Sequence, residues 1–440
     1  MKRHGHVGSS LLNEKEARRN VTYLASLDFI ISLGFGLIMP LFPLYLTYLE
    51  EDSANLGLQV GILFASFMLM RALLAAPFGH LSDRVGRKRI ILIGSFLYAI
   101  LAILFTVPDD WFGLIFVRAF QGVASAMVWP VSEALVIDSS PPSMRGASLG
   151  KIVMAANLGM VIGPFVGGGL FGLAYHTLGF SLEDSYKFPF YFTAILALGG
   201  GVFVWRNVTD AVVPRESKTK LSLHQMFNPD GMDRQGLRNL KVLYTNAAME
   251  GFAFASIGPL MILFLDFKFP ALGADTIPLI IGVGMGLGAL IAYPSGRLAD
   301  RVGKKKMFVI GGYFAFIGTM LIPMGVLLAV VIVFLAMRSM AFQVSSPALR
   351  ALQADIVPES IRGRLIGVLE SMSNAGSVVG AIAGGLMWDI FRGMDFGMAA
   401  PFDGTIVPFL VSGGLGVVTV SMVLFLVKEP RSPQPDAVRR

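Results

Sequence analysis

The sequence has no cysteine among its 440 residues, which excludes disulfide bonds and thiolate chemistry. Histidine is scarce as well, and none of its five copies lies inside a long apolar run. Charged residues make up only 15% of the chain, against roughly 25% in soluble domains. There is no H-E-x-x-H pattern and no glycine-rich phosphate loop. These shortages argue against an enzyme, so we expect no catalytic residue, no metal and no cofactor.

Apolar residues, by contrast, make up 54% of the sequence. A hydrocarbon core of about 30 Å is crossed by about 20 apolar residues in a helix. The apolar runs allow twelve such crossings and predict an all-α, polytopic membrane protein. The twelve transmembrane helices are expected at about 21–48, 57–78, 90–107, 111–138, 147–173, 188–205, 239–265, 276–295, 307–323, 326–354, 364–388 and 405–427.

The positive charges indicate how these helices are oriented. Nearly all of the 36 Lys and Arg lie in the two tails and in alternate loops. The intervening loops contain only Lys187, Lys268 and Arg392. This bias predicts an integral protein of the cytoplasmic membrane with both termini in the cytoplasm. The net charge of +7 is then a topology signal, and we expect the lipid bilayer, not nucleic acid, as the partner.

One charged loop occurs twice. It reads GHLSDRVGRKR at 79–89 and GRLADRVGKKK at 296–306, 217 residues farther along. The same offset relates Asp138 to Asp355 and a run of glycines that begins with Gly159 and Gly376. The chain is therefore predicted to be a duplication, and duplicated bundles are typical of transporters.

The duplication sets the expected domains. Residues 1–205 form one six-helix bundle, and residues 239–440 form a second, pseudo-symmetric bundle that ends in a short tail. The polar stretch 206–238 is expected to be a cytoplasmic linker between them. Its length would let the two bundles move independently.

The repeated loop resembles the signature of the major facilitator superfamily, and the resemblance covers almost the whole chain. Glycines in the loop permit a tight turn and close helix approach. The resemblance implies that Asp83 meets the start of the eleventh helix, near Gly363, when the outside is open, while the loop bases pair with acids such as Asp138. The alternative is a simple positive-inside anchor. The expected gating residues are Gly79, Asp83, Arg84, Gly86, Arg87, Asp138, Gly296, Asp300, Arg301, Gly303 and Asp355.

Two motifs in the fourth and fifth helices resemble further patterns of that superfamily. Arg118 and Gln121 fit R-x-x-Q-G, in which the arginine is thought to modulate proton uptake; the alternative is an arginine that extends to the membrane surface. The run GMVIGPFVGGGL resembles the motif associated with antiporters, although close helix packing alone would also explain it. Its residues are Gly159, Gly163, Pro164, Gly167 and Gly168.

Four acids inside the predicted spans break the repeat. A carboxylate at bilayer depth costs about 2.5–3.5 kcal/mol, so each acid is expected to have a function or a partner. Glu250 and Asp28 are the first and second candidates for a proton-coupling or substrate-binding carboxylate. Glu133 and Glu370 could equally form gating pairs with Arg71 or with a loop arginine. When the two repeats are aligned at the offset of 217, Asp28, Glu133, Glu250 and Glu370 align with Thr245, Arg350, Leu33 and Val153, respectively.

In the resembled superfamily, helices 1, 4, 7 and 10 line the central cavity. That implies a site containing Asp28, Arg118, Glu133 and Glu250. The segment LGFGLIMPLFP at 33–43 further resembles the twelve-helix drug/proton antiporter branch.

The expected function is secondary active transport, by proton-coupled antiport, of small amphiphilic or cationic compounds out of the cell. The partners would be protons and a small-molecule substrate, and the chain would act as a monomer. The alternatives are a nutrient facilitator, a proton symporter or a lipid flippase on the same fold, and a substrate sensor is a further possibility.

Overall fold

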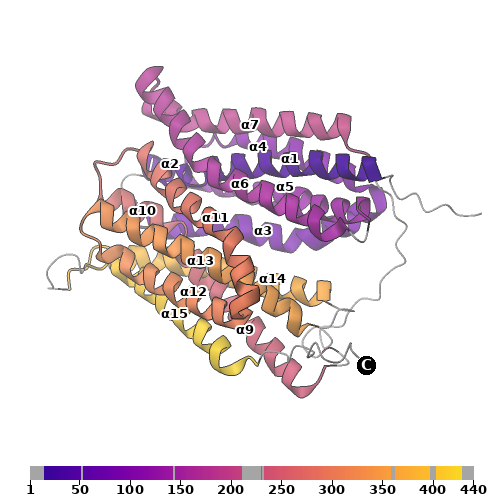
Figure 1. The fold of residues 1–440 in the computed structure, drawn as a ribbon. Coiled ribbons are helices and arrows are strands. Elements are labelled where there is room, and N and C mark those ends of the chain that lie inside the picture. The colour runs from indigo at the N-terminus through magenta and orange to yellow at the C-terminus, as the bar shows by residue number, and fades with distance from the viewer. Residues whose placement is uncertain are drawn as a thin grey trace, which may run out of the picture. The chain divides into compact units, whose positions relative to one another are not determined.

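The computed structural model of the chain describes residues 14–50, 53–141, 144–210, 229, 232–357, 362–396 and 403–428. These residues are almost entirely helical (Figure 1). One isolated β-bridge, between Asp395 and Asp403, is the strand pairing seen among them. Most of the expected linker, and the tail after 428, lie outside the described residues.

The helices of the two sequence halves correspond one for one. In the first half they are α1 (Glu14–Ile38), α2 (Leu41–Leu49), α3 (Leu56–Val85), α4 (Arg87–Leu104), α5 (Trp111–Ser139), α6 (Arg145–Gly172) with a π-helical extension (Leu173–Thr177), and α7 (Leu182–Asn207). In the second half they are α9 (Arg234–Ile257), α10 (Leu260–Lys268), α11 (Thr276–Val302), α12 (Lys304–Leu321), α13 (Leu328–Ile356), α14 (Arg362–Phe391) and α15 (Ile406–Leu426).

The predicted all-α, twelve-helix fold is confirmed. Among the described residues, 10 segments are long and apolar enough to cross a membrane. The other two positions are taken by α4, which opens with three basic residues, and by the shorter apolar stretch Thr276–Ile291 of α11. The first and seventh predicted helices are each broken in two, by Pro40 and Pro259, because proline has no N–H for the helical ladder.

Many large apolar side chains are exposed on the helices, as expected in lipid. Ile195, Leu290 and Phe425 expose 68%, 74% and 77% of their surface. Polar groups are instead enclosed: Asp28 and Arg118 are each 1% exposed. A soluble protein has the opposite distribution, so the pattern supports an integral membrane protein.

The chain forms two compact units with the same internal packing. In the first, α1 packs on α6 and α7, and α4 packs on α5 and α7. In the second, α9 packs on α14 and α15, and α12 packs on α13 and α15. Three helices are divided between the units. Ala54–Ala65, with the start of α3, belongs to the second unit, and Leu265–Gly282, with the end of α10 and the start of α11, belongs to the first.

An asparagine near the start of each unit holds the end of its last helix. The Asn20 amide donates to the Thr209 carbonyl at 2.8 Å and accepts from the Thr209 N–H at 3.0 Å. Asn239 makes the same two bonds with Lys428, at 2.8 and 3.1 Å. The two clamps are 219 residues apart, not 217, and this difference matters for the acids below.

Candidate transport and gating sites

The repeated loop forms the same turn in both units. Gly86 has φ 100° and Gly303 has φ 107°, and each residue directly precedes a helix, α4 and α12 respectively. Only glycine adopts this backbone conformation without strain. Gly79 differs from the expectation of a close helix contact, because a Cβ added there would meet nothing within 4 Å.

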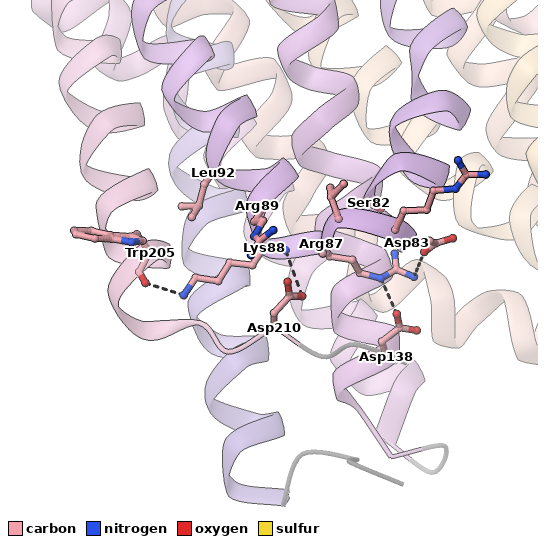
Figure 2. A pocket seen from close by; sticks show the side chains of 12 residues that line it. Ser82, Asp83, Arg87, Lys88, Arg89, Leu92, Asp138, Trp205 and Asp210 are labelled. Atoms are coloured by element: carbon pink, nitrogen blue, oxygen red, sulfur yellow. Dashed lines mark hydrogen bonds and ion pairs between the residues drawn. The ribbon is translucent and has the colours of Figure 1, made fainter. Parts of the chain in front are cut away.

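Arg87 is the centre of an ion cluster beneath the first loop (Figure 2). Its Nε lies 2.6 Å from Asp138 Oδ2, and its Nη2 lies 3.0 Å from Asp83 Oδ1. Arg87 and Asp138 are buried, with side-chain exposures of 6% and 7%. The expected pairing of a loop base with Asp138 is therefore present, and it joins the start of α4 to the end of α5.

The second unit has a weaker version of this cluster. Lys304 Nζ lies 2.6 Å from Asp355 Oδ2, but these side chains are 30% and 46% exposed. Arg84 and Arg301 are exposed at the ends of α3 and α11. Gly296 and Asp300 lie in α11, and their side chains are outside the part of the chain that the structure describes.

Sequence reasoning missed Trp205 and Asp210, two residues that contact the first loop. Lys88 Nζ donates to the Trp205 carbonyl at 2.8 Å, and the Lys88 N–H points to Asp210 Oδ1 at 3.4 Å (Figure 2). Asp210 also lies against Gly86, where an added Cβ would collide with its carboxylate. A cavity of about 540 Å³ is lined by these residues and the loop. Asp210 sits just past the last helix of the unit, where no motif marks it.

The glycines of the antiporter-like motif press α6 against α1. A Cβ on Gly159 would lie 2.5 Å from the Phe29 carbonyl oxygen, and one on Gly163 would lie 2.6 Å from the backbone of Gly36. Gly167 packs on Leu37 in the same way, whereas Gly168 packs on the start of the α11 segment. Pro164 is buried inside α6.

The same glycine seam exists in the second unit, where Gly376, Gly380 and Gly384 pack α14 against α9. Because the second copy has Ala381 in place of the proline, the seam itself does not depend on the complete motif. Close packing is thus common to both units.

Asp28 of α1 is enclosed beside α5. Ser132 Oγ donates to its Oδ2 at 3.2 Å, and its Oδ1 has no hydrogen-bond partner among the described residues. Glu133, the next residue of α5, is close enough to act on Asp28 electrostatically, and its own side chain is exposed. An acid on α5 therefore acts on the enclosed acid of α1, which has the Ser132 hydroxyl as its neighbouring donor.

Arg118 of α5 is held by aromatic rings. Its guanidinium lies 4.6, 5.1 and 5.4 Å from the ring centroids of Phe67, Phe35 and Phe42, and Nη1 donates to Gln121 Oε1 at 2.5 Å. Cation–π contacts of this kind stabilise a desolvated cation by about 2 kcal/mol or more. Arg118 does not extend to the surface, since it is 1% exposed.

The aromatic group continues toward Asp28. The ring centroids of Phe35 and Trp129 of α5 are 5.8 Å apart. The guanidinium carbon of Arg71, on α3, lies 4.7 Å from the Trp129 ring centroid. Trp129 is three residues before Ser132, which bonds Asp28. Arg71 was expected as a partner for an acid, and the structure places its guanidinium over an aromatic ring.

The second unit places its acids differently. Glu250 of α9 is half-buried, and Arg350 of α13 acts on it electrostatically. Arg338 lies 5.7 Å from the Phe254 ring and donates from Nε to Thr319 Oγ1 at 3.0 Å. Glu370 is exposed on α14, and no hydrogen bond or ion pair to it occurs among the described residues.

The repeat register used for two of the acids is wrong. Gly159 packs on Phe29, and its counterpart Gly376 packs on Ala248, an offset of 219 between the facing helices α1 and α9. The second unit is two residues shorter between its first helix and its basic loop. Asp28 therefore corresponds to Ala247 and Glu250 to Ile31. Both acids still break the symmetry.

Several proteins resemble this chain. It is 29% identical over 386 residues to the multidrug resistance protein MdtG of Proteus mirabilis, covering 85% of this chain and 89% of that one. It is 25% identical over 381 residues to multidrug resistance protein 2 of Bacillus subtilis, covering 83% and 88%. A crystal structure of a bacterial homolog of the human lysosomal transporter Spinster, inward-facing and unoccupied, has the same fold, with a TM-score of 0.70 and 17% identity over 94% and 96% of the two chains.

The duplicated helices, the apolar exposed surface and the paired charged loops define a polytopic membrane transporter. The family model described as Major Facilitator Superfamily matches residues 24–324 and again 243–440. The chain belongs to that superfamily of secondary transporters, and it is not an enzyme.

Proposed function

We propose that this transporter is a proton-coupled antiporter that exports small amphiphilic or cationic compounds across the cytoplasmic membrane. In this proposal the bundles 1–205 and 239–440 alternate access to a substrate, both termini are cytoplasmic, and the monomer is the working unit. The names of the two drug-resistance relatives support export. The motif at 159–170 supports antiport by resemblance.

The observation that carries the proposal is the placement of Asp28. Its carboxyl group is 1% exposed within a membrane-spanning helix, and its described hydrogen-bond partner is one serine hydroxyl. A group in this position is a candidate to bind and release a proton, because holding a permanent charge there is costly. Glu133 on α5 is the neighbouring acid through which that step would be modulated. Arg118 lies 14 residues before Ser132 on α5, about 21 Å along the helix axis, so its influence on Asp28 would be indirect.

The acids and aromatic rings also favour a cationic substrate. Glu133 has an exposed side chain and Glu250 a half-buried one. Trp129 and Phe254, each four residues away from one of these acids, are aromatic rings that already bind the cations Arg71 and Arg338. Aromatic faces bind organic cations by cation–π attraction. Glu370 remains a proposed member of this group.

Conformational gating is assigned to the repeated loops. Asp83, Arg87 and Asp138 form an ion cluster. In the proposal, this cluster rearranges when the transporter changes from one transport state to the other. The corresponding residues of the second copy would play the weaker role that their exposure suggests. This gating role is separate from proton binding, so the two can be tested separately.

The experiment uses proteoliposomes with an acidic lumen and a luminal pH dye. When tetraphenylphosphonium is added outside, antiport should raise the luminal pH as protons leave in exchange. A proton symporter would lower the luminal pH, and a facilitator would leave it unchanged. Asp28→Asn should remove the response but not tetraphenylphosphonium binding measured on the purified protein. A full response in Asp28→Asn would contradict the assignment.

A further inference from the structure

The start of α3 is capped by a carboxylate from a distant helix. Asp389, in the last turn of α14, accepts from the Gly57 N–H at 2.8 Å with Oδ1 and from the Leu58 N–H at 2.7 Å with Oδ2. The first N–H groups of a helix have no partner within the helix, and its N-terminus carries a partial positive charge. Asp389 satisfies both requirements from 331 residues away in the sequence.

Small residues bring these two helices close enough for the cap. A Cβ on Gly57 would lie 2.6 Å from the Gly385 carbonyl oxygen, and Gly61 packs one turn farther along on the Ala381 backbone. Trp388, beside the capping acid, is 1% exposed. Arg392 adds a contact at 3.4 Å to the Ala54 carbonyl. All of these residues belong to the second unit.

In the corresponding seam of the first unit, no cap from a distant helix occurs among the described residues. There Gly168, the counterpart of Gly385, packs on Asp275 at the start of α11. The counterpart of Asp389 is Gly172, which has no side chain. Asp275 directly precedes α11 and lies 3.5 Å from His176 of the π-helical extension. The carboxylate at the start of α11 thus comes from its own chain segment, whereas the one on α3 comes from α14.

We propose that Asp389 is a conformational latch that holds the start of α3 on α14 in one of the two transport states. The inference rests on the alternating access proposed above. α3 belongs to the second unit up to Ala65 and to the first from Ser66 on. Release of its start from α14 would therefore change the part of α3 that belongs to the second unit.

At the other end of the same two helices, the expected contact has the opposite arrangement: α3 supplies the acid and α14 the helix start. Asp83 lies near the C-terminal end of α3 and, by its motif, is expected to meet the start of α14. Asp389 lies near the C-terminal end of α14 and meets the start of α3. The 30 residues of α3 separate its two ends by about 45 Å. A pivot of the two helices would therefore engage one acid as it releases the other.

The test measures the distance between two spin labels, at Ala54→Cys and Gly393→Cys. The chain has no cysteine of its own, and a Cβ at Gly393 meets nothing within 4 Å, so the labels are specific and tolerated. Both positions are exposed, at the start of α3 and just past α14. Asp389→Asn should lower the ratio of short to long distances about fivefold to tenfold, because it removes the negative charge at the helix N-terminus and one of the two acceptor oxygens. An unchanged distribution overturns the latch.

Two further variants separate the latch from ordinary helix capping. Adding Asn55→Asp to Asp389→Asn gives α3 a carboxylate from its own sequence, directly before its first residue. If Asp389 acts as a latch, the long distances should persist. Recovery of the short distance would show that Asp389 merely stabilises the helix end, and would overturn the proposal. Asp389→Glu keeps the charge and should retain most of the short-distance population, which serves as the test should the Asn variant fail to fold.

The distance measurement needs neither substrate nor a proton gradient. A wild-type chain that shows the latch but never exchanges protons for tetraphenylphosphonium would contradict antiport alone. A chain that exchanges them normally, with distances unaffected by Asp389→Asn, would contradict the latch alone.

Discussion

The two units share a frame but differ in what they enclose. Both have a glycine with positive φ in the basic loop and an asparagine clamp at the last helix. Both also have a glycine seam, between α1 and α6 in the first unit and between α9 and α14 in the second. Inside, the first unit encloses Asp28 beside a serine, and Arg118 among aromatic rings. The second unit leaves Glu250 half-buried, with a basic residue acting on it. Repeated features therefore describe the scaffold, and unrepeated ones are the place to look for coupling.

The largest expected effect comes from neutralising the two acids, Asp28 in the first unit and Glu250 in the second, one at a time. Asp28→Asn should reduce proton-driven transport about 100-fold or more, since it removes a group that we propose carries the proton. Glu250→Gln should raise the tetraphenylphosphonium concentration needed for half-maximal transport and reduce the maximal rate less. Initial rates in proteoliposomes at several concentrations measure both. The opposite ranking of the two variants would return Glu250 to first place, where the sequence alone put it.

The ion pairs beneath the loops should differ in strength. Arg87→Gln leaves the buried Asp138 without its 2.6 Å partner and should cost about 3–5 kcal/mol of stability. Lys304→Gln breaks a solvent-exposed pair and should cost about 0–1 kcal/mol. Thermal unfolding in the same detergent compares the two variants. Equal losses would mean that the exposure difference between the units has no energetic consequence.

The glycine seams, in contrast, should respond alike. Gly163→Ala and Gly380→Ala each place a methyl group against the backbone of a neighbouring helix, and each should cost about 1–3 kcal/mol. Gly169→Ala is the matched control, because a Cβ there meets nothing within 4 Å. Unfolding temperatures provide the measurement. If Gly163→Ala alone abolished coupling while stability stayed intact, the seam of the first unit would have a role specific to antiport.

The loop glycines should differ from one another, and Gly79 should show the smallest effect of all. Gly86→Ala forces a side chain into a backbone conformation, φ 100° and ψ 135°, that favours glycine, at a cost of about 1–3 kcal/mol. It also crowds Asp210. Gly303→Ala should show the backbone cost alone, since nothing lies near its added Cβ. Gly79→Ala should be neutral in stability. A clear loss at Gly79→Ala would point to a contact made in another conformation.

Much of the site could be predicted from residues whose neighbours are local in sequence or repeated. The loop around Gly86 and Gly303 was found because it occurs twice, and Arg118 with Gln121 lies within one helical turn. Asp210 and Asp389 were not found, because each has its partner far away in the sequence and no motif of its own. The register of Asp28 was misassigned because a two-residue difference before the basic loop cannot be located without the packing of α6 on α1.

The sequence by itself determined the membrane class, the number of helices, the duplication and the superfamily, since these follow from apolar run length, charge placement and a repeated motif. Only the tertiary structure decided which acid is enclosed, what holds Arg118, and which helix caps the start of α3. The reason is physical: hydropathy and periodicity are properties of neighbouring residues along the chain. Enclosure and capping are instead set by residues from other helices, whose distance in sequence carries no information about their distance in space.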